Sequence, residues 1–306
     1  MGIICLNCGG TRSAVVGPYK AVLPFSDQYF QGQVVKCLDC GLHFLDAPPP
    51  PDQLKKFYSE VYRQAGARHN QTNPGRQNRS FNPWSRAYAF WDLLRTQPGL
   101  PAKGKIVDVG AGWGYFLLAA KEYGSFECTA IETDQHAGAF LSESGFTVLP
   151  QLLEEVDHAA YRESFDIVSL SHVLEHSTEP KIMLGQIKDM LKPGGLAVIE
   201  VPNEDFTIPG YIQRENDAPH VVFFSRDVLR GMLERCGFTV IFCETAGWPR
   251  AMGARSANSK SFLHRLTGWL QSRVLVHLNR RWGNPEMFNY GGDRIGLRAL
   301  VRKQAS

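Results

Sequence analysis

The feature that most constrains the fold is a regular alternation of strand-like and helix-like segments from about residue 105 onward. Short apolar runs predict strands, and segments with apolar residues at helical spacing predict helices between them. The strands are expected at 105–109, 128–131, 146–149, 166–170, 196–201 and 239–243, and the helices at 115–123, 135–144, 180–191 and 226–236. This order predicts an α/β fold, with a mostly parallel sheet and helices on both of its faces.

Three further elements complete the predicted architecture. A late strand at 296–301 would close the sheet, and we expect it to run antiparallel beside 239–243. Before the alternation begins, one helix capped by Asp52 would reach about residue 62, and another would cover 83–95. The length of 306 residues suggests two domains rather than one.

Four of the seven cysteines form two pairs near the N-terminus, Cys5 with Cys8 and Cys37 with Cys40. Two CxxC pairs separated by 28 residues suit one tetrahedral zinc ion better than disulfides. A module of about 50 residues is also too small to be stable by apolar burial alone. We therefore predict a zinc-ribbon module at 1–50 with a structural ion, followed by a larger domain at 51–306. Four unliganded thiols are the alternative.

A predicted strand runs directly into a glycine turn, with Asp108 followed by Gly110, Gly112 and Gly114. Glycines there let the backbone approach a ligand closely, and the next helix offers free N–H groups. The spacing is not the dinucleotide fingerprint G-x-G-x-x-G, and a pyrophosphate would be poorly served by the carboxylate. A cationic ligand without phosphate would tolerate it. Glu132 ends the next strand, where a carboxylate can accept hydrogen bonds from both ribose hydroxyls of an adenosine group.

Together with VLEH at 173–176 and LKPGG at 191–195, these motifs resemble those of the class I S-adenosylmethionine-dependent methyltransferases. The resemblance covers roughly 61–245 and implies a Rossmann-like, seven-stranded, mostly parallel sheet with its last strand antiparallel. It implies that Asp108 and the three glycines line the methionine end of S-adenosylmethionine, and that Glu132 holds the ribose. By the same resemblance, Gln151 and Leu152 would flank the adenine, while Ser171 and His172 would lie near the sulfonium.

The chain is also similar to a narrower group of these enzymes that carry an N-terminal zinc ribbon. The shared marks are the two cysteine pairs, GLxF within 41–44, the proline-rich link that follows, and PHxxFFS at 219–225. Members of this group methylate deoxysugars, glycans and natural products. The resemblance therefore implies a sugar or natural-product acceptor. Our own hypothesis is that the target is a hydroxyl, with carbon or nitrogen as alternatives.

Two histidines are the candidate catalytic residues. Methyl transfer is an in-line displacement on a sulfonium, so the enzyme must align the reactants and remove the acceptor's proton, a task that suits histidine near neutral pH. His220 precedes the helix at 226–236, and His176 opens the helix after the strand at 166–170. Both are expected at the carboxyl edge of the sheet, where α/β proteins bind ligands, with His220 as the base. The alternative for each is a histidine bonded to the backbone.

Two long segments contain bases but no Asp or Glu. Residues 61–91 hold five arginines and residues 245–285 hold seven Lys or Arg, so at a net charge of +3 the rest of the chain is acidic. The two segments are either solvated surface or an anion-binding surface that would suit a phosphate-bearing acceptor. We expect a basic helical insertion at about 250–290. Its apolar stripe at 260–282 would pack over the sheet as a lid or, alternatively, contact a membrane surface.

The expected protein is therefore a cytoplasmic S-adenosylmethionine-dependent methyltransferase with a structural zinc ion. A cytoplasmic location follows because no apolar run approaches a membrane span and the N-terminus lacks the pattern of a secretory signal. Its acceptor would be a small molecule or glycan, with an anionic group. An RNA methyltransferase that grips phosphates through its ribbon and basic segments is one alternative. A non-catalytic binding protein that keeps the cofactor fold is the other.

Overall fold

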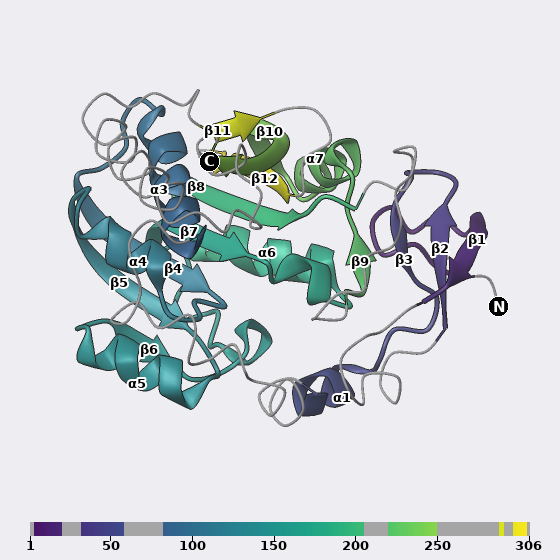
Figure 1. Ribbon diagram of the computed structural model, residues 1–306, viewed down its shortest axis with the longest axis horizontal. Helices are drawn as coiled ribbons and strands as arrows, with labels where there is room; N and C mark the ends of the chain where they lie inside the picture. The colour runs from purple at the N-terminus through teal and green to yellow at the C-terminus, as the bar shows by residue number, and fades with distance from the viewer. Residues whose placement is uncertain are drawn as a thin grey trace, which may run out of the picture.

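The structure is a computed structural model that describes residues 3–19, 32–57, 82–204, 220–249, 288–290 and 296–304. Its main sheet has the strand order β11-β10-β12-β8-β7-β4-β5-β6 (Figure 1). The strands are β4 (Lys103–Val109), β5 (Ser125–Ile131), β6 (Thr147–Leu149), β7 (Phe165–Ser171), β8 (Leu191–Pro202), β10 (Phe238–Pro249), β11 (Phe288–Tyr290) and β12 (Gly296–Lys303).

The directions of these strands confirm the predicted fold class. Strands β6, β5, β4, β7 and β8 pair in parallel, whereas β12 lies between β8 and β10 and is antiparallel to both. Seven strands thus form the expected Rossmann-like sheet with an antiparallel last strand. In addition, β11 pairs antiparallel with β10 and adds an eighth strand at the edge.

Helices cover both faces of the sheet because successive side chains on a strand point to opposite faces. Ile106 packs in one core with aromatic residues of α3 and α4, while its neighbour Val107 packs in the other with apolar residues of α6 and α7. The helices are α1 (Pro51–Lys56), α3 (Asn82–Arg95), α4 (Tyr115–Ala120), α5 (Gln135–Glu143), α6 (Pro180–Met190) and α7 (Arg226–Arg235), with short 3-10 turns η3 (Leu153–Glu155) and η4 (Leu174–His176).

Two details of the helix predictions were wrong. Helix α1 begins at Pro51, which fits the first turn because a proline there loses no hydrogen bond, so Asp52 lies inside the helix instead of capping it. His176 ends the 3-10 turn η4 and does not open α6, which starts at Pro180. The expected continuation of the first helix to residue 62 lies outside the described residues.

A second, small antiparallel sheet combines three N-terminal strands with one strand that follows β8 in the sequence. It has the order β1 (Ser13–Pro18), β2 (Gln33–Cys37), β3 (His43–Leu45) and β9 (Val222–Phe223). No strand was expected at 219–225, but Phe223 pairs with His43 and Val222 with Phe44. Figure 1 shows β9, in green, beside the purple and blue strands of the N-terminal module. One strand after β8 therefore completes the N-terminal sheet, and the division at residue 50 stays a prediction.

The predicted basic insertion at about 250–290, with its stripe at 260–282, lies outside the described residues except for β11. Among the helices that the structure does describe, none is long and apolar enough to cross a membrane. The lid and membrane interpretations of the stripe therefore stay predictions.

Candidate active site

The glycine loop after β4 has the left-handed backbone that glycine adopts most easily. The φ angles of Gly110, Gly112 and Gly114 are 65°, 52° and 66°. A Cβ atom at Gly110 would lie 2.5 Å from Val173, and one at Gly114 would collide with Leu141, whereas one at Gly112 would meet no atom within 4 Å. The loop is therefore tightly packed at its two ends and open at its middle, where a ligand can approach the backbone.

Two carboxylates flank this open middle. Asp108 is buried in β4 opposite Ser169 of β7, whose hydroxyl donates a 2.5 Å hydrogen bond to Asp108 Oδ1. Burial raises the pKa of Asp108 to about 7. Glu132 follows β5, and its two oxygens accept hydrogen bonds from the backbone N–H groups of Gly112 at 2.7 Å and Asp134 at 2.6 Å. The sequence motifs thus meet at the carboxyl edge of β4 and β5, as predicted for a nucleoside-type ligand.

The other predicted cofactor residues follow β6 and β7. The side-chain amide of Gln151 donates to the carbonyl of Glu155 at 2.9 Å, and the backbone N–H of Leu152 donates to the Glu155 carboxylate at 3.1 Å. The Ser171 hydroxyl is buried and has no hydrogen-bond partner among the described residues. An orphaned buried hydroxyl, the open space at Gly112 and the acidic Asp108 together fit a cationic nucleoside cofactor such as S-adenosylmethionine.

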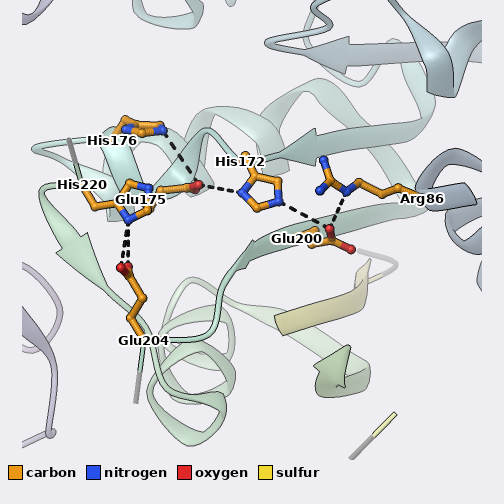
Figure 2. A network of polar contacts seen from close by, with 7 residues as sticks. All are labelled: Arg86, His172, Glu175, His176, Glu200, Glu204 and His220. Atoms are coloured by element: carbon orange, nitrogen blue, oxygen red, sulfur yellow. Dashed lines mark hydrogen bonds and ion pairs between the residues drawn. The ribbon is translucent and has the colours of Figure 1, made fainter. Parts of the chain in front are cut away.

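His172 belongs to a charged network that the sequence did not reveal (Figure 2). Its Nδ1 lies 3.2 Å from Glu175 Oε1 and its Nε2 lies 3.5 Å from Glu200 Oε1. Burial and the Arg86 guanidinium act to lower the pKa of His172, but the two carboxylates outweigh them and raise it to about 9. His172 is therefore an imidazolium at neutral pH, and its placement near the sulfonium stays a prediction.

Glu200 is buried at one end of this network, where three basic side chains surround its carboxylate. Arg86 Nε lies 2.7 Å from Glu200 Oε1, and Arg298 Nε donates to Glu200 Oε2 at 2.8 Å. Burial alone would raise the pKa of Glu200, but the two guanidinium groups and His172 hold it far below its usual range. The network thus ties α3, β8 and β12 to the turn after β7.

His176 and His220 lie together at the other end of the network, although 43 residues separate them along the chain. Their ring centroids are 5.0 Å apart. His220 is 6% exposed, and its Nδ1 lies 3.0 Å from both oxygens of the buried Glu204. Burial lowers the pKa of His220, but the Glu204 carboxylate raises it above its ordinary value. The structure therefore brings both predicted histidines to one place, with His220 beside Glu204 and His176 beside Glu175.

Sequence reasoning missed the acidic members of the site: Glu175, Glu200 and Glu204. Glu175 belongs to the VLEH motif, but the sequence indicated no role for it. Glu200 carried a signal that could have been used, because a charged residue within the apolar strand 196–201 is buried and must be paired. The residues that pair with it, Arg86 and Arg298, come from distant segments and have no local signature.

The four predicted zinc ligands also come together. Cys5 Sγ lies 3.5 Å from Cys40 Sγ, Cys8 Sγ lies 3.6 Å from Cys37 Sγ, and one ligand atom from each residue lies within 4.8 Å of the others. The backbone N–H groups two residues after Cys5 and Cys8 point at their sulfurs, at 3.4 Å each. Burial raises the pKa of Cys5, and a cation bound among the four sulfurs would favour its thiolate. The four sulfurs fit one tetrahedral ion.

This geometry defines the Rossmann-like fold of the class I methyltransferases. A family model described as a methyltransferase domain matches residues 81–241, more than half of the chain. The chain therefore belongs to this family. Residues 81–241 form a methyltransferase domain, which confirms the predicted enzyme family.

Two named relatives each match part of the chain. The chain is 30% identical over 171 residues to a tRNA U34 carboxymethyltransferase of Idiomarina loihiensis, covering 48% of this chain and 50% of that protein. It is 33% identical over 120 residues to a ubiquinone biosynthesis O-methyltransferase of an Azoarcus species, covering 38% of this chain and 51% of that protein. The chain thus spans about half the length of the curated relatives it matches.

One solved structure resembles nearly the whole chain. It is the 1,6-didemethyltoxoflavin-N1-methyltransferase of Burkholderia thailandensis, with bound 1,6-didemethyltoxoflavin and S-adenosylhomocysteine. The TM-score is 0.52 at 15% identity, with coverage of 94% of this chain and 100% of that chain. At this identity the likeness shows the fold alone.

Proposed function

We propose that this protein transfers the methyl group of S-adenosylmethionine to a hydroxyl of a phosphate-bearing sugar or natural product. The observation that carries the proposal is the buried pair of His220 and Glu204 beside His176. A buried carboxylate that holds one imidazole nitrogen orients the ring and stabilises its protonated form, which is the arrangement of a general base.

In this mechanism His220 is the proton acceptor and Glu204 is its positioning residue. Glu204 engages Nδ1, so the hydroxyl's proton would move to Nε2 as the oxygen attacks the methyl carbon. Bound S-adenosylmethionine supplies the electrophilic methyl group, and its sulfonium leaves as a neutral thioether. His176, whose ring lies beside His220, would contact the acceptor.

We assign the cofactor's surroundings to the residues at the carboxyl edge of β4 to β7. Asp108 and the glycine loop would receive the methionine end, and Glu132 the ribose. Gln151 and Leu152 would flank the adenine, with Ser171 and His172 on the side of the sulfonium. Supporting this assignment, Glu132 already faces the open middle of the loop through its bond to Gly112.

A structural zinc ion at Cys5, Cys8, Cys37 and Cys40 is part of the proposal. It is supported by the clustering of the four sulfurs. Because all four tetrahedral positions are filled by sulfur, the ion has no open site for substrate.

The phosphate on the acceptor is inferred from the two arginine-rich segments. Among the arginines of these two segments, Arg86 is the one that the structure describes. It is paired with Glu200, so we assign it to the network and not to the acceptor. The anion-binding role therefore falls on arginines at 63–79 and 250–281, which lie outside the described residues.

An RNA methyltransferase is the second candidate, favoured by the likeness to the tRNA-modifying relative. This candidate predicts that the affinity for RNA falls steeply as the salt concentration rises. Basic side chains that neutralise phosphates release bound counterions, and each released counterion makes this fall steeper. The family match favours an enzyme over a non-catalytic protein with the cofactor fold.

The deciding experiment supplies S-adenosylmethionine with an isotopically labelled methyl group to fractionated metabolites, glycans and RNA of the source cell. Mass spectrometry then identifies which molecule, and which atom, gains the label. Label on a hydroxyl of a phosphorylated sugar or natural product supports the proposal. Label found only in RNA selects the second candidate and refutes the first.

Replacement of His220 tests the mechanism with whichever acceptor is found. His220→Ala should lower turnover by about 10² or more while leaving cofactor affinity nearly unchanged. Glu204→Gln should act in the same direction through His220, with a smaller loss. Unchanged turnover in His220→Ala removes the residue from the mechanism.

A further inference from the structure

The side chains of Glu175, His176 and His220 form a cluster apart from the cysteine site. One ligand atom from each lies within 4.8 Å of the others, as in the cysteine cluster. The cluster joins the turn η4 to the segment before β9, and the backbone N–H of Val221 donates to the Glu175 carbonyl at 2.8 Å. Figure 2 shows both rings beside the Glu175 carboxylate. The backbone therefore holds the three side chains in place.

Glu175 is the part of the cluster that a histidine base alone does not explain. Its side chain is 0% exposed, and its Oε2 has no hydrogen-bond partner among the described residues. Oε1 lies 3.2 Å from His172 Nδ1 and 3.8 Å from His176 Nε2. An unsatisfied buried polar atom destabilises the fold, and it does so more strongly when it is charged. A cation against Oε2 would remove that cost.

The two histidines are arranged as metal ligands often are. A histidine that binds a metal through one nitrogen commonly gives the other to a carboxylate, which fixes the ring. Glu204 holds Nδ1 of His220 in this way, so Nε2 is the nitrogen that would bind the ion. His172 holds Glu175 Oε1 in the same supporting manner.

We propose that Glu175, His176 and His220 bind a divalent transition-metal ion. Two imidazoles and one carboxylate suit zinc, cobalt or iron(II), whereas magnesium prefers oxygen ligands. Three protein ligands leave a coordination position open, as in catalytic sites. The cluster differs in this from the four cysteines, which close their coordination sphere.

This inference rests on the proposed function and refines it. The acceptor's hydroxyl oxygen would take the open position, where the ion lowers its pKa. The hydroxyl proton then leaves to solvent water, and the oxygen forms the new bond to the methyl carbon as the bond from that carbon to sulfur breaks. In this form His220 Nε2 binds the ion and no longer accepts the proton, so the role of His220 changes from base to metal ligand.

The test counts metal ions and does not depend on turnover. The full chain is exchanged into cobalt(II), dialysed, and analysed by elemental mass spectrometry together with its absorption spectrum. Thiolate-to-cobalt charge-transfer bands report on the cysteine site alone. We expect two ions per chain, one of which contributes no such band.

Variants assign the second ion. Glu175→Gln and His176→Ala should each bind one ion per chain and keep the thiolate bands. Cys37→Ser should lose those bands and retain the other ion with lower affinity, because the N-terminal sheet helps to position His220. Glu204→Gln should weaken the second ion about 10- to 100-fold. Glu127→Gln, which changes an exposed carboxylate, is the matched control and should keep both ions. His176 is partly exposed, so its variant remains informative if Glu175→Gln fails to fold.

One ion per chain in the unaltered protein overturns the inference, as does a second ion that survives both Glu175→Gln and His176→Ala. Labelled methyl transfer to a hydroxyl without a second ion would leave the proposed function standing and remove the metal. A second ion in a protein that methylates only RNA would support the metal site and refute the proposed function.

Discussion

Asp108 gives the sharpest test of the cofactor site because its pKa falls within the range of ordinary buffers. Burial raises the pKa from 3.8 to about 7, the Ser169 hydroxyl opposes this, and the Glu132 charge adds to it. The methionine end of S-adenosylmethionine carries a sulfonium and an ammonium group. Binding therefore favours the ionised carboxylate, and below pH 7 it must release a proton.

The size of the effect follows from this pKa. With a midpoint at 7, about three quarters of Asp108 is ionised at pH 7.5 but only about 3% at pH 5.5. The dissociation constant should therefore rise about 25-fold between these pH values, or roughly 2 kcal/mol. Isothermal titration calorimetry at half-unit steps measures it, and two buffers with different ionisation enthalpies count the released proton.

Two variants separate Asp108 from other titrating groups. Ser169→Ala removes the hydrogen bond that lowers the pKa, so the midpoint should move above 7. Asp108→Asn should bind the cofactor more weakly at pH 7.5 and lose the pH dependence. An affinity that stays flat between pH 5.5 and 7.5, or a slope that survives in Asp108→Asn, would refute the placement of Asp108 at the cofactor.

The same residue predicts the pH dependence of stability without cofactor. Because the pKa in the folded state is raised, the stability from this group is fully present below pH 3.8 and is lost as the pH rises through 7. The span of about three pH units corresponds to about 4 kcal/mol. Asp108→Asn should therefore raise the Tm at pH 8, relative to the unaltered protein, and change it little at pH 4.

Three further outcomes are expected. Gly114→Ala should lower the free energy of unfolding by more than the ~1–2 kcal/mol of a left-handed alanine, because its Cβ collides with Leu141. Gly112→Ala should lose only that ~1–2 kcal/mol but bind cofactor poorly; denaturant unfolding and calorimetry compare the two. Arg298→Met should destabilise the fold by about 3 kcal/mol or more because it strips the buried Glu200 of one partner, and adding Glu200→Gln should restore part of the loss in the same unfolding assay. Cys37→Ser, or chelation of the ribbon's ion, should speed hydrogen exchange in β2 and β3 and lower turnover about tenfold or more, with little change in cofactor affinity.

The fold could be predicted largely because its signals are local. Each strand of the main sheet is an apolar run, and each crossover helix carries its own periodicity, so segments such as β7 and α6 were found within one or two residues of their bounds. The glycine loop was equally visible, since left-handed φ angles restrict three positions to glycine. Strand β11 was missed because three residues at a sheet edge depend on the partner that they join.

The polar site could be predicted only in part, for a related reason. Histidines 176 and 220 were selected by their place after strands, which is a local property. Their carboxylates depend on strand order: Glu200 and Arg298 are direct neighbours across β8 and β12, and that register cannot be derived without knowing that β12 inserts between β8 and β10. A buried ion pair of this kind depends on two segments that lie far apart in the sequence, so neither segment predicts it alone.

The N-terminal sheet, which lies next to the four cysteines, also holds the segment that follows His220. Val221, next to His220, accepts a hydrogen bond from the N–H of Leu45 in β3 and donates one to the Glu175 carbonyl. The ribbon therefore holds one side of the segment and the turn after β7 holds the other. Tyr19, which follows β1, packs against Phe223, and burial together with the Glu204 charge raises its pKa. Because Cys37 belongs to β2, which pairs with β3, an ion bound by the four cysteines would also help to fix the position of His220.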